Sequence, residues 1–227
     1  MRALKLHKWD LQPREAIQIQ QHLGSMINLT PLRKKIQFIG GTDLSFTKGS
    51  DRLWAGVVVL SFPDLAKVEE RWIRGTVNFP YIPGLLSFRE LPHIIRAIEM
   101  LKVLPDVIIC DGQGIAHPRG VGIASHLGLL LGVPTIGCAK SKLIGEFQEP
   151  DFRKGSYSLI KHKERIIGAA LRSKDFVKPI FISPGNMITL RESIDIVIRC
   201  CKHYRIPEPV RSAHILANRI RKKEGVV

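Results

Sequence analysis

A carboxylate at the end of an apolar run is the first candidate for chemistry in this sequence. Asp111 follows four apolar residues, 107–110, and precedes Gly112-Gln113-Gly114. Such a run is typical of a strand buried on both faces, and open α/β sheets place ligands beyond the carboxyl ends of these strands. The glycines leave room for a metal or a phosphate near the backbone. The alternative is an Asp that only shapes a turn, and one Asp-Gly pair by itself favours that alternative.

Two more carboxylates belong to elements that could bring them to Asp111. Asp43 lies inside a strand-like run, where an unpaired charge is costly to bury. Glu90 lies early in a helical segment. Taken singly, Asp43 could cap a turn and Glu90 could be a solvated helix residue. Together, two or three carboxylates form a set of hard oxygen ligands that suits Mg²⁺, with Mn²⁺ as a substitute.

A histidine near the end of the chain could complete such a site. His214 lies in the last helical segment. A metal between carboxylates lowers the pKa of a bound water and neutralises charge on a phosphate, and a histidine beside it could shuttle a proton. Taken alone, a helix histidine is more often a surface or packing residue.

The elements that must position these residues change type along the chain. A helix is expected over 12–27, then three antiparallel strands, a loop over 78–84 and a helix bent or restarted at Pro92. A strand, a helix and a strand follow in the alternation of a parallel βαβ unit. A hairpin and two helices complete the chain. The expected strands are 36–46, 53–62, 67–77, 106–111, 134–139, 156–160 and 165–171, and the later helices are 85–101, 120–131, 190–201 and 210–223.

This element order is the ribonuclease H-like order, an α/β fold whose mixed sheet has helices on both faces. In such a sheet Asp43, Glu90 and Asp111 converge at one end of the two central strands. We find no internal repeat and no dividing linker, so residues 1–227 are expected to form a single domain and, without a coiled-coil pattern, a monomer.

Composition favours a polyanionic partner. The chain has 35 Lys and Arg against 20 Asp and Glu, a formal net charge of +15. This excess favours nucleic acid over a membrane surface, although a basic proteome would also produce it. No apolar stretch reaches the roughly 20 residues of a membrane span, and residues 1–10 lack an apolar signal core. The four cysteines form neither a metal pair nor a disulfide framework, so we expect buried thiols in a cytoplasmic protein.

Specific motifs resemble the endonuclease V family of deoxyinosine-specific repair nucleases. The resemblance runs from about Leu6 to Arg219 and shows no departure at the acidic positions; position 113 varies between Gln and His in the family. The motifs are Asp43-Leu44-Ser45-Phe46, Phe79-Pro80-Tyr81-Ile82-Pro83-Gly84-Leu85-Leu86-Ser87-Phe88-Arg89-Glu90, Asp111-Gly112-Gln113-Gly114, His117-Pro118-Arg119, Gly122-Ile123-Ala124-Ser125-His126, Pro134-Thr135-Ile136-Gly137-Cys138-Ala139-Lys140 and Arg205-Ile206-Pro207-Glu208-Pro209 to His214.

The resemblance implies a ribonuclease H-like fold and Mg²⁺-dependent cleavage at the second phosphodiester bond 3′ to a deaminated base, chiefly hypoxanthine. It implies that Asp43, Glu90 and Asp111 hold the metal, with His214 beside them and Lys140 on a phosphate near the reaction centre. Further phosphate contacts are expected from Gly114, His117 and Ser125. The base pocket is expected to include Gly84, Leu85, Gly112 and Gly137.

The loop Pro80-Tyr81-Ile82-Pro83 gains a meaning from this resemblance. Two prolines fix φ on either side of an apolar pair and stiffen the tip. A stiff apolar tip can act as a wedge in a base stack, with Tyr81 filling the space of an extruded base. Without the flanking match, a proline-rich turn with a packing tyrosine is the better interpretation.

Three functions remain distinct at this stage. The first is a nuclease acting on deoxyinosine in DNA, and the second is cleavage of inosine-containing RNA, which recognition of a 2′-OH would decide. The third is a basic protein that binds distorted nucleic acid without cutting it. The C-terminal stretch 199–227, with eight Lys or Arg against two Glu, fits a phosphate-tracking surface or a solvated helix face.

Overall fold

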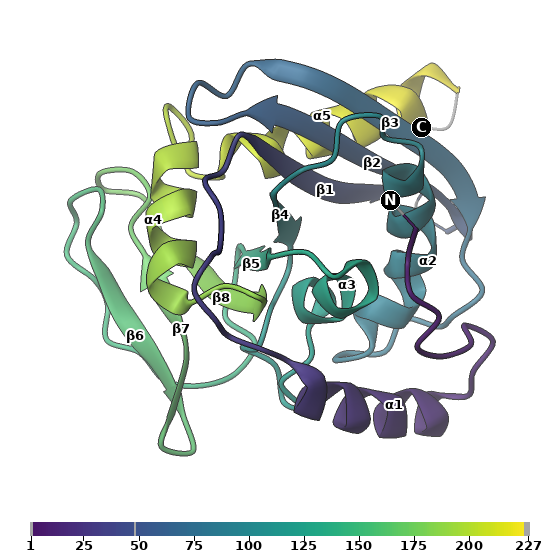
Figure 1. The fold of residues 1–227 in the computed structure, drawn as a ribbon, viewed down its shortest axis with the longest axis horizontal. Helices are drawn as coiled ribbons and strands as arrows, with labels where there is room; N and C mark the ends of the chain where they lie inside the picture. Colours follow the sequence, from purple (N-terminus) through teal and green to yellow (C-terminus); the bar gives the residue numbers. More distant parts are fainter. Residues whose placement is uncertain (1, 48, 225–227) are drawn as a thin grey trace.

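One eight-stranded mixed sheet organises the chain in the computed structural model, which describes residues 2–47 and 49–224. The strand order is β3-β2-β1-β4-β5-β8-β7-β6 (Figure 1). The predicted antiparallel meander is confirmed, because β2 pairs antiparallel with both β1 and β3. Its strands are β1 (Phe38–Phe46), β2 (Arg52–Ser61) and β3 (Lys67–Thr76).

The predicted parallel unit lies in the middle of the sheet. Strand β4 (Val107–Asp111) runs parallel to β1, and β5 (Thr135–Ala139) runs parallel to β4. Helix α3 (Ile123–Leu131) connects them and ends at Gly132, whose φ of 63° is the left-handed conformation that glycine adopts most easily. The carboxyl ends of β1 and β4 are therefore neighbours, as a shared site requires.

One strand was not predicted. Strand β8 (Ile180–Asn186) pairs antiparallel with β5 on one side and with β7 on the other. Pro184 and Gly185 interrupt its sequence, and both residues ordinarily indicate a turn. The predicted hairpin of β6 (Tyr157–His162) and β7 (Arg165–Leu171) is confirmed and forms the far edge of the sheet.

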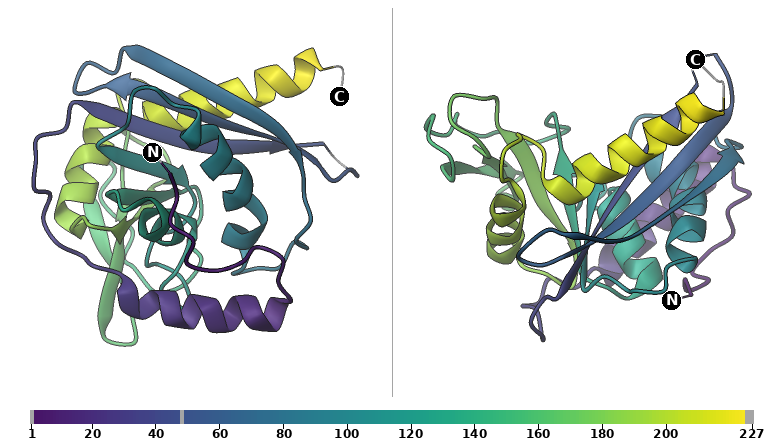
Figure 2. Two further views of the ribbon diagram at one scale, coloured as in Figure 1. Left: turned by 45° about the vertical axis from the view of Figure 1, so that its right-hand side comes forward. Right: turned by 90° about the horizontal axis from the view of Figure 1, so that it is seen from above.

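Helices cover both faces of the sheet, as predicted (Figure 2). On one face α2 and α3 pack over the central strands, and α1 contacts α3. Helix α2 passes through Pro92 without restarting, so the predicted restart is wrong. On the other face α4 and α5 pack against the sheet. The bounds are α1 (Pro13–Met26), α2 (Leu86–Glu99), α4 (Leu190–Cys200) and α5 (Glu208–Lys223).

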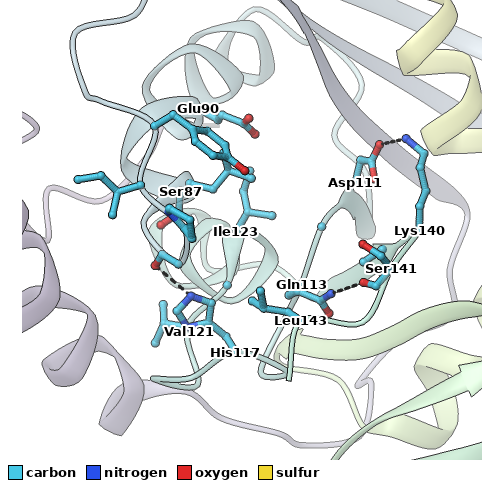
Figure 3. Close-up of a pocket in the computed structure, with 18 of the residues that line it drawn as sticks. Ser87, Glu90, Asp111, Gln113, His117, Val121, Ile123, Lys140, Ser141 and Leu143 are labelled. Carbon is cyan, nitrogen blue, oxygen red and sulfur yellow. Dashed lines mark hydrogen bonds and ion pairs between the residues drawn. The ribbon is translucent and has the colours of Figure 1, made fainter. Parts of the chain in front are cut away.

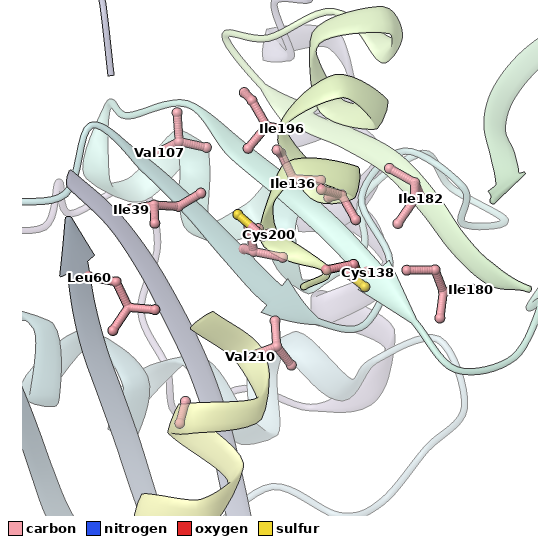
Figure 4. Packing of buried hydrophobic residues seen from close by; sticks show 14 of the residues in the cluster. Ile39, Leu60, Val107, Ile136, Cys138, Ile180, Ile182, Ile196, Cys200 and Val210 are labelled. Atoms are coloured by element: carbon pink, nitrogen blue, oxygen red, sulfur yellow. The ribbon is translucent and has the colours of Figure 1, made fainter. Parts of the chain in front are cut away.

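The core on the α4 and α5 side draws aliphatic side chains from the strands and both helices (Figure 4). Cys138 and Cys200 belong to it, and all four cysteines are buried free thiols, as predicted. No helix in the described part of the chain has both the length and the apolar character that a membrane crossing needs.

Glycines allow α5 to lie directly on the sheet. A Cβ at Gly41 would overlap the backbone of Pro209 and Val210, and one at Gly56 would lie 3.1 Å from the carbonyl oxygen of Ala213. This close approach brings the first half of α5 over β1. His214 follows Ala213, so it lies above the carboxyl half of β1, where Asp43 is located.

Candidate active site

Asp43 and His214 form the first half of an ionic cluster. Asp43 Oδ2 lies 2.6 Å from His214 Nδ1, and Asn218 Nδ2 lies 3.1 Å from His214 Nε2. Asn218 is one helical turn beyond His214 on α5, so both side chains share a face of that helix. Burial and the charge of Asp111 raise the pKa of Asp43 above its ordinary value, against the hydrogen bond from His214.

Asp111 and Lys140 form the second half. Asp111 is the last residue of β4, and Lys140 directly follows β5, so parallel pairing brings both to the same edge of the sheet. Lys140 Nζ donates to Asp111 Oδ2 (Figure 3). Arg205 donates to the backbone oxygen of Lys140 at 3.0 Å and so holds the segment that carries the lysine.

Glu90 lies behind this ionic pair. It occupies the second turn of α2 and is 8% exposed. Burial, with the charges of Asp43 and Asp111 added, raises its pKa to about 8. Glu90 is therefore mostly protonated at pH 7 in the absence of a cation, and the three carboxylates interact electrostatically although they come from three different elements.

The donor set fits a hard divalent cation, although the side chains do not yet surround one. Among the described residues no three His, Cys, Asp or Glu side chains are gathered closely enough to hold a metal. Asp43 instead contacts the ring of His214, and Asp111 contacts the ammonium group of Lys140. The repulsion that raises the pKa of Asp43 and Glu90 is the repulsion that a divalent cation would remove. The role of the three carboxylates as metal ligands stays a prediction.

A cavity of about 460 Å³ opens beside the carboxylates (Figure 3). Asp43, Glu90 and Asp111 lie on its wall, together with Lys140. The start of α2, the start of α3 and the loop that follows β4 form much of the remaining lining. The cavity therefore combines a charged edge with a wall of glycines and of apolar and neutral polar side chains.

Two helices begin at this cavity. Leu86 and Ser87 start α2, and Ile123 starts α3; all three line the cavity. The first N–H groups of a helix have no acceptor within the helix and carry its positive dipole end. The wall is consequently suited to a ligand that presents acceptor atoms, such as a carbonyl oxygen or ring nitrogen of a base.

Gly84 is the best-anchored part of the wall. Its φ of 80° favours glycine, and its carbonyl oxygen accepts three hydrogen bonds, from Gln20 Nε2 at 3.0 Å, Arg119 at 2.8 Å and His117 Nε2 at 3.0 Å. Burial and the neighbouring Arg119 lower the pKa of His117 to about 4, so the ring is neutral. Sequence reasoning did not assign Gln20; it lies in α1, and no local pattern links it to Gly84.

The structure separates the predicted base-pocket residues into two groups. Gly84 and Gly112 line the cavity. Leu85 lies in an apolar cluster and is 1% exposed. A Cβ at Gly137 would overlap the backbone of the loop after β4, so this glycine supports that loop from below. Leu85 and Gly137 therefore shape the pocket without forming its surface.

The predicted phosphate contacts also divide. His117 lines the cavity, but its Nε2 is bonded to Gly84. The N–H of Gly114 donates to Ser183 Oγ at 2.8 Å on β8, the unpredicted strand. Ser125 is fully buried within α3, where every side chain is buried, so the structure offers its hydroxyl no path to a phosphate.

The expected wedge is an exposed tip on fixed ends. Tyr81 is 70% exposed. On one side of it Phe79 is buried and its carbonyl accepts from Arg89 at 2.7 Å. On the other side the N–H of Leu85 donates to the carbonyl of Ile82 at 2.9 Å. Tyr81 and Ile82 also line the cavity, so the tip and the pocket are one continuous surface.

Comparison with known proteins agrees with this geometry. The family model of endonuclease V matches residues 21–215. Endonuclease V of Dictyoglomus turgidum is 50% identical over 210 residues, which cover 92% of this chain and 91% of that protein. The crystal structure of the Bacillus subtilis endonuclease V superimposes with a TM-score of 0.94 at 34% identity and 99% coverage of both chains.

A nucleic-acid complex is among the similar structures. Endonuclease V of Ciona intestinalis, in complex with a 23mer DNA containing an inosine followed by a ribo-adenosine, is similar with a TM-score of 0.85 at 30% identity. The match covers 95% of this chain and 99% of that one. The ribonuclease H-like fold is thereby confirmed. From these matches over nearly its whole length, this chain belongs to the endonuclease V family and is an endonuclease.

Proposed function

We propose that this protein recognises deoxyinosine in DNA and, with Mg²⁺, cuts the second phosphodiester bond 3′ to the lesion. The observation that carries the proposal is the cavity that joins three carboxylates to two helix starts. The carboxylates are suited to phosphate chemistry and the helix starts to a base. The similar Ciona protein was crystallised with inosine-containing DNA, which supports the same substrate class here.

Asp43, Glu90 and Asp111 would hold the metal, with Mn²⁺ able to replace Mg²⁺. When bound there, such an ion supplies an activated water and neutralises charge on the attacked phosphate. The chain contributes two side chains that already lie at the carboxylates, the imidazole of His214 and the ammonium group of Lys140. Lys140 can move from Asp111 to a phosphate oxygen, because its side chain is 49% exposed and its backbone is fixed by Arg205.

His214 would handle the proton. Asp43 accepts from its Nδ1–H, which fixes the ring orientation and leaves Nε2 as the acceptor that Asn218 contacts. At Nε2 a proton can be taken from water or returned to the leaving oxygen. Asn218 also accepts from Ser45 on β1 at 2.8 Å, so α5 and the central strand together orient the histidine.

The lesion base would occupy the cavity after leaving the base stack. An endonuclease that inspects a base inside a duplex must extrude it. The carbonyl that deamination creates on the base is an acceptor, and the starts of α2 and α3 present backbone N–H groups as donors, those of Phe88 and Ala124 being already bonded to Leu85 and Gln113. Tyr81 would fill the gap in the stack from the exposed tip of the loop. Because this tip is not packed on the protein, a purely structural role for Tyr81 is less favoured.

We also infer that the chain acts as one domain, because its eight strands belong to one sheet; that it acts as a monomer stays the prediction from the sequence. This inference covers the described part of the chain; residues 1, 48 and 225–227 lie outside it.

The test is a cleavage assay on an oligonucleotide with one deoxyinosine, in Mg²⁺ and in EDTA. The unmodified duplex, an inosine-containing RNA and a deoxyinosine strand with one ribonucleotide after the lesion are run in parallel. A Mg²⁺-dependent nick at the second 3′ linkage of the DNA lesion supports the proposal. Binding without any product would favour a non-catalytic role.

A second candidate function is cleavage at inosine in RNA. It is favoured by one observation, the ribo-adenosine that follows inosine in the Ciona complex. Products from the RNA or the ribonucleotide-containing strand, with none from the all-DNA strand, would select this candidate. The carboxylate chemistry would be unchanged, and the preferred sugar would differ.

A further inference from the structure

A series of hydrogen-bonded polar side chains leads from partly buried His7 in the N-terminal segment, through buried His126, to the cavity. His7 Nδ1 lies 2.7 Å from the carbonyl oxygen of Lys8, and His7 Nε2 lies 2.7 Å from His126 Nε2. His126 Nδ1 lies 3.0 Å from Ser87 Oγ. Of these three side chains, His7, His126 and Ser87, it is Ser87 that lines the cavity, at the start of α2. No step of the proposed chemistry uses this relay.

The relay has only one consistent set of protons. A backbone carbonyl can only accept, so His7 Nδ1 must carry a hydrogen. Burial lowers the pKa of His7 and lowers that of His126 well below the ordinary value, which favours the neutral form of both rings. His7 Nε2 is then an acceptor, and His126 Nε2 must donate to it. His126 Nδ1 is left as an acceptor, and Ser87 must donate its hydroxyl hydrogen there.

The surroundings keep this arrangement fixed. His126 is fully buried, with the Trp9 ring stacked at 5.7 Å between centroids and the Phe88 ring edge-on at 5.1 Å. Reversing the relay would place a ring lone pair against the carbonyl of Lys8. A serine hydroxyl ordinarily rotates to suit its partner, but here its hydrogen is committed, and only oxygen lone pairs remain for a ligand in the cavity.

We propose that Ser87 Oγ is an acceptor that reads the N1–H of hypoxanthine and thereby distinguishes it from adenine. This inference rests on the proposed function. Adenine has a lone pair at N1, whereas deamination puts a hydrogen there. Hypoxanthine therefore donates a hydrogen bond to Ser87. With adenine, the lone pair of N1 would face a lone pair of Ser87 Oγ, at a site with no bulk water to separate them.

The same chemistry determines which bases Ser87 can distinguish. Guanine also carries N1–H, so Ser87 does not reject guanine, and the 2-amino group of guanine must be excluded by another part of the wall. Ser87 is 2% exposed, so the contact requires a base fully inserted against the start of α2. The role is one of specificity, and no bond is made or broken at Ser87.

The experiment measures equilibrium binding in EDTA to three otherwise identical duplexes, with deoxyinosine, deoxyadenosine or deoxyguanosine at one position. The variants are Ser87→Ala, His126→Phe, and Ser193→Ala as a matched control. Ser193 is a fully buried serine on α4, on the opposite face of the sheet, whose hydroxyl donates to Thr189 at 2.8 Å.

We expect Ser87→Ala to lower the preference for deoxyinosine over deoxyadenosine about tenfold, the scale of one hydrogen bond at a buried polar site. His126→Phe keeps the core filled and releases the Ser87 hydroxyl, so it should lower the preference similarly, with no further loss in the double variant. Ser193→Ala should match the wild type. An unchanged preference in Ser87→Ala would overturn the inference.

Failure of the proposed function gives a different result, because the wild type itself would then show no preference for deoxyinosine. The relay has its own measurement, the ¹⁵N chemical shifts of the His126 ring in histidine-labelled protein, identified by their loss in His126→Phe. The expected tautomer carries hydrogen at Nε2. A hydrogen at Nδ1 would show that Ser87 is free to donate, which also overturns the inference.

Discussion

The two sides of the cavity differ in how their polar groups are held. On the charged edge, Asp43 and Asp111 are paired with side chains that are half exposed, 53% for His214 and 49% for Lys140. On the other wall, His117 is buried and neutral, and His126, also buried, holds the hydroxyl of Ser87 from behind the wall. In the proposed function, Asp43 and Asp111 exchange these side-chain partners for a metal, and Lys140 moves to a phosphate. The wall keeps its donors and acceptors fixed, which is what discrimination between bases requires.

Glu90 belongs to both sides. It is buried as the wall residues are, yet its pKa of about 8 is raised by burial and by the two carboxylates of the edge. The proposed catalytic and base-reading roles therefore meet at α2, which carries Ser87 on its first turn and Glu90 one turn later. Variants on the two sides should therefore separate effects on the cleavage rate from effects on the preference for deoxyinosine.

The largest expected effect is on the charged edge. Asp43→Asn or Asp111→Asn should lower the cleavage rate about a thousandfold or more, the scale of losing a preorganised electrostatic contact to the transition state. Binding of deoxyinosine DNA in EDTA should be unchanged or tighter, because a negative charge near the phosphates is removed. Single-turnover cleavage and fluorescence anisotropy measure the two quantities. Asp195→Asn, an exposed carboxylate on α4, is the control, and full activity in both edge variants would contradict this assignment.

The second effect concerns stability in the absence of metal. The unfolded chain releases the Glu90 proton near the ordinary glutamate pKa, whereas the folded chain keeps it up to about pH 8. Between these values the folded state binds more protons, so the contribution of Glu90 to the free energy of unfolding falls as pH rises, by at most roughly 1.4 kcal/mol per pH unit. Glu90→Gln removes this dependence.

Urea unfolding in EDTA at pH 5.5, 6.5 and 7.5 measures the difference between Glu90→Gln and the wild type. The variant should gain stability relative to the wild type as pH rises. Glu146→Gln, at an exposed glutamate, is the control. A difference that does not change with pH would mean that Glu90 is ionised throughout and that the charges of Asp43 and Asp111 do not act on it.

The third effect tests proton handling. His214→Ala should lower single-turnover cleavage about a hundredfold, the lower range for a general acid or base, with binding retained. Asn218→Ala should lower it less, because Asn218 only orients the ring through Nε2. His203→Ala, at an exposed histidine outside the cavity, should have no effect. Equal rates for His214→Ala and the wild type would leave His214 a purely structural partner of Asp43.

The contrast between edge and wall also explains what the sequence could predict. Asp43 and Asp111 interrupt or end apolar strands, and that local signal singled out two carboxylates that line one cavity. The wall depends on contacts between distant segments. His7, Ser87 and His126 come from the N-terminal segment, α2 and α3, and each type of residue, read singly, indicates packing or a cap. Strand β8 was missed because Pro184 and Gly185 indicate a turn, yet its Ser183 fixes the loop after Asp111.

The smallest of these effects belongs to the loop that borders both sides. Tyr81 is 70% exposed, so Tyr81→Ala should leave the free energy of unfolding nearly unchanged. Its ring should instead stabilise the complex in which the base has left the stack, where a base–aromatic contact contributes roughly 1–3 kcal/mol. The preference for deoxyinosine over undamaged duplex should therefore fall about tenfold, and Tyr81→Phe should retain it because the ring alone provides the stacking.

Tyr157→Ala is the matched control, since Tyr157 is 52% exposed on β6 at the far edge of the sheet. A loss in both tyrosine variants would indicate general weakening of the basic surface.

A combined Tyr81→Ala, Ser87→Ala variant then sharpens the contrast. Suppose that the wedge helps to extrude the base and that the wall identifies it. Tyr81→Ala should then weaken binding of the deoxyguanosine duplex only to the extent that its base is extruded. The deoxyinosine-to-deoxyadenosine ratio would carry the Ser87 effect in addition. Full additivity of the two losses would show that extrusion and reading are separate steps, because coupled groups at one step do not add.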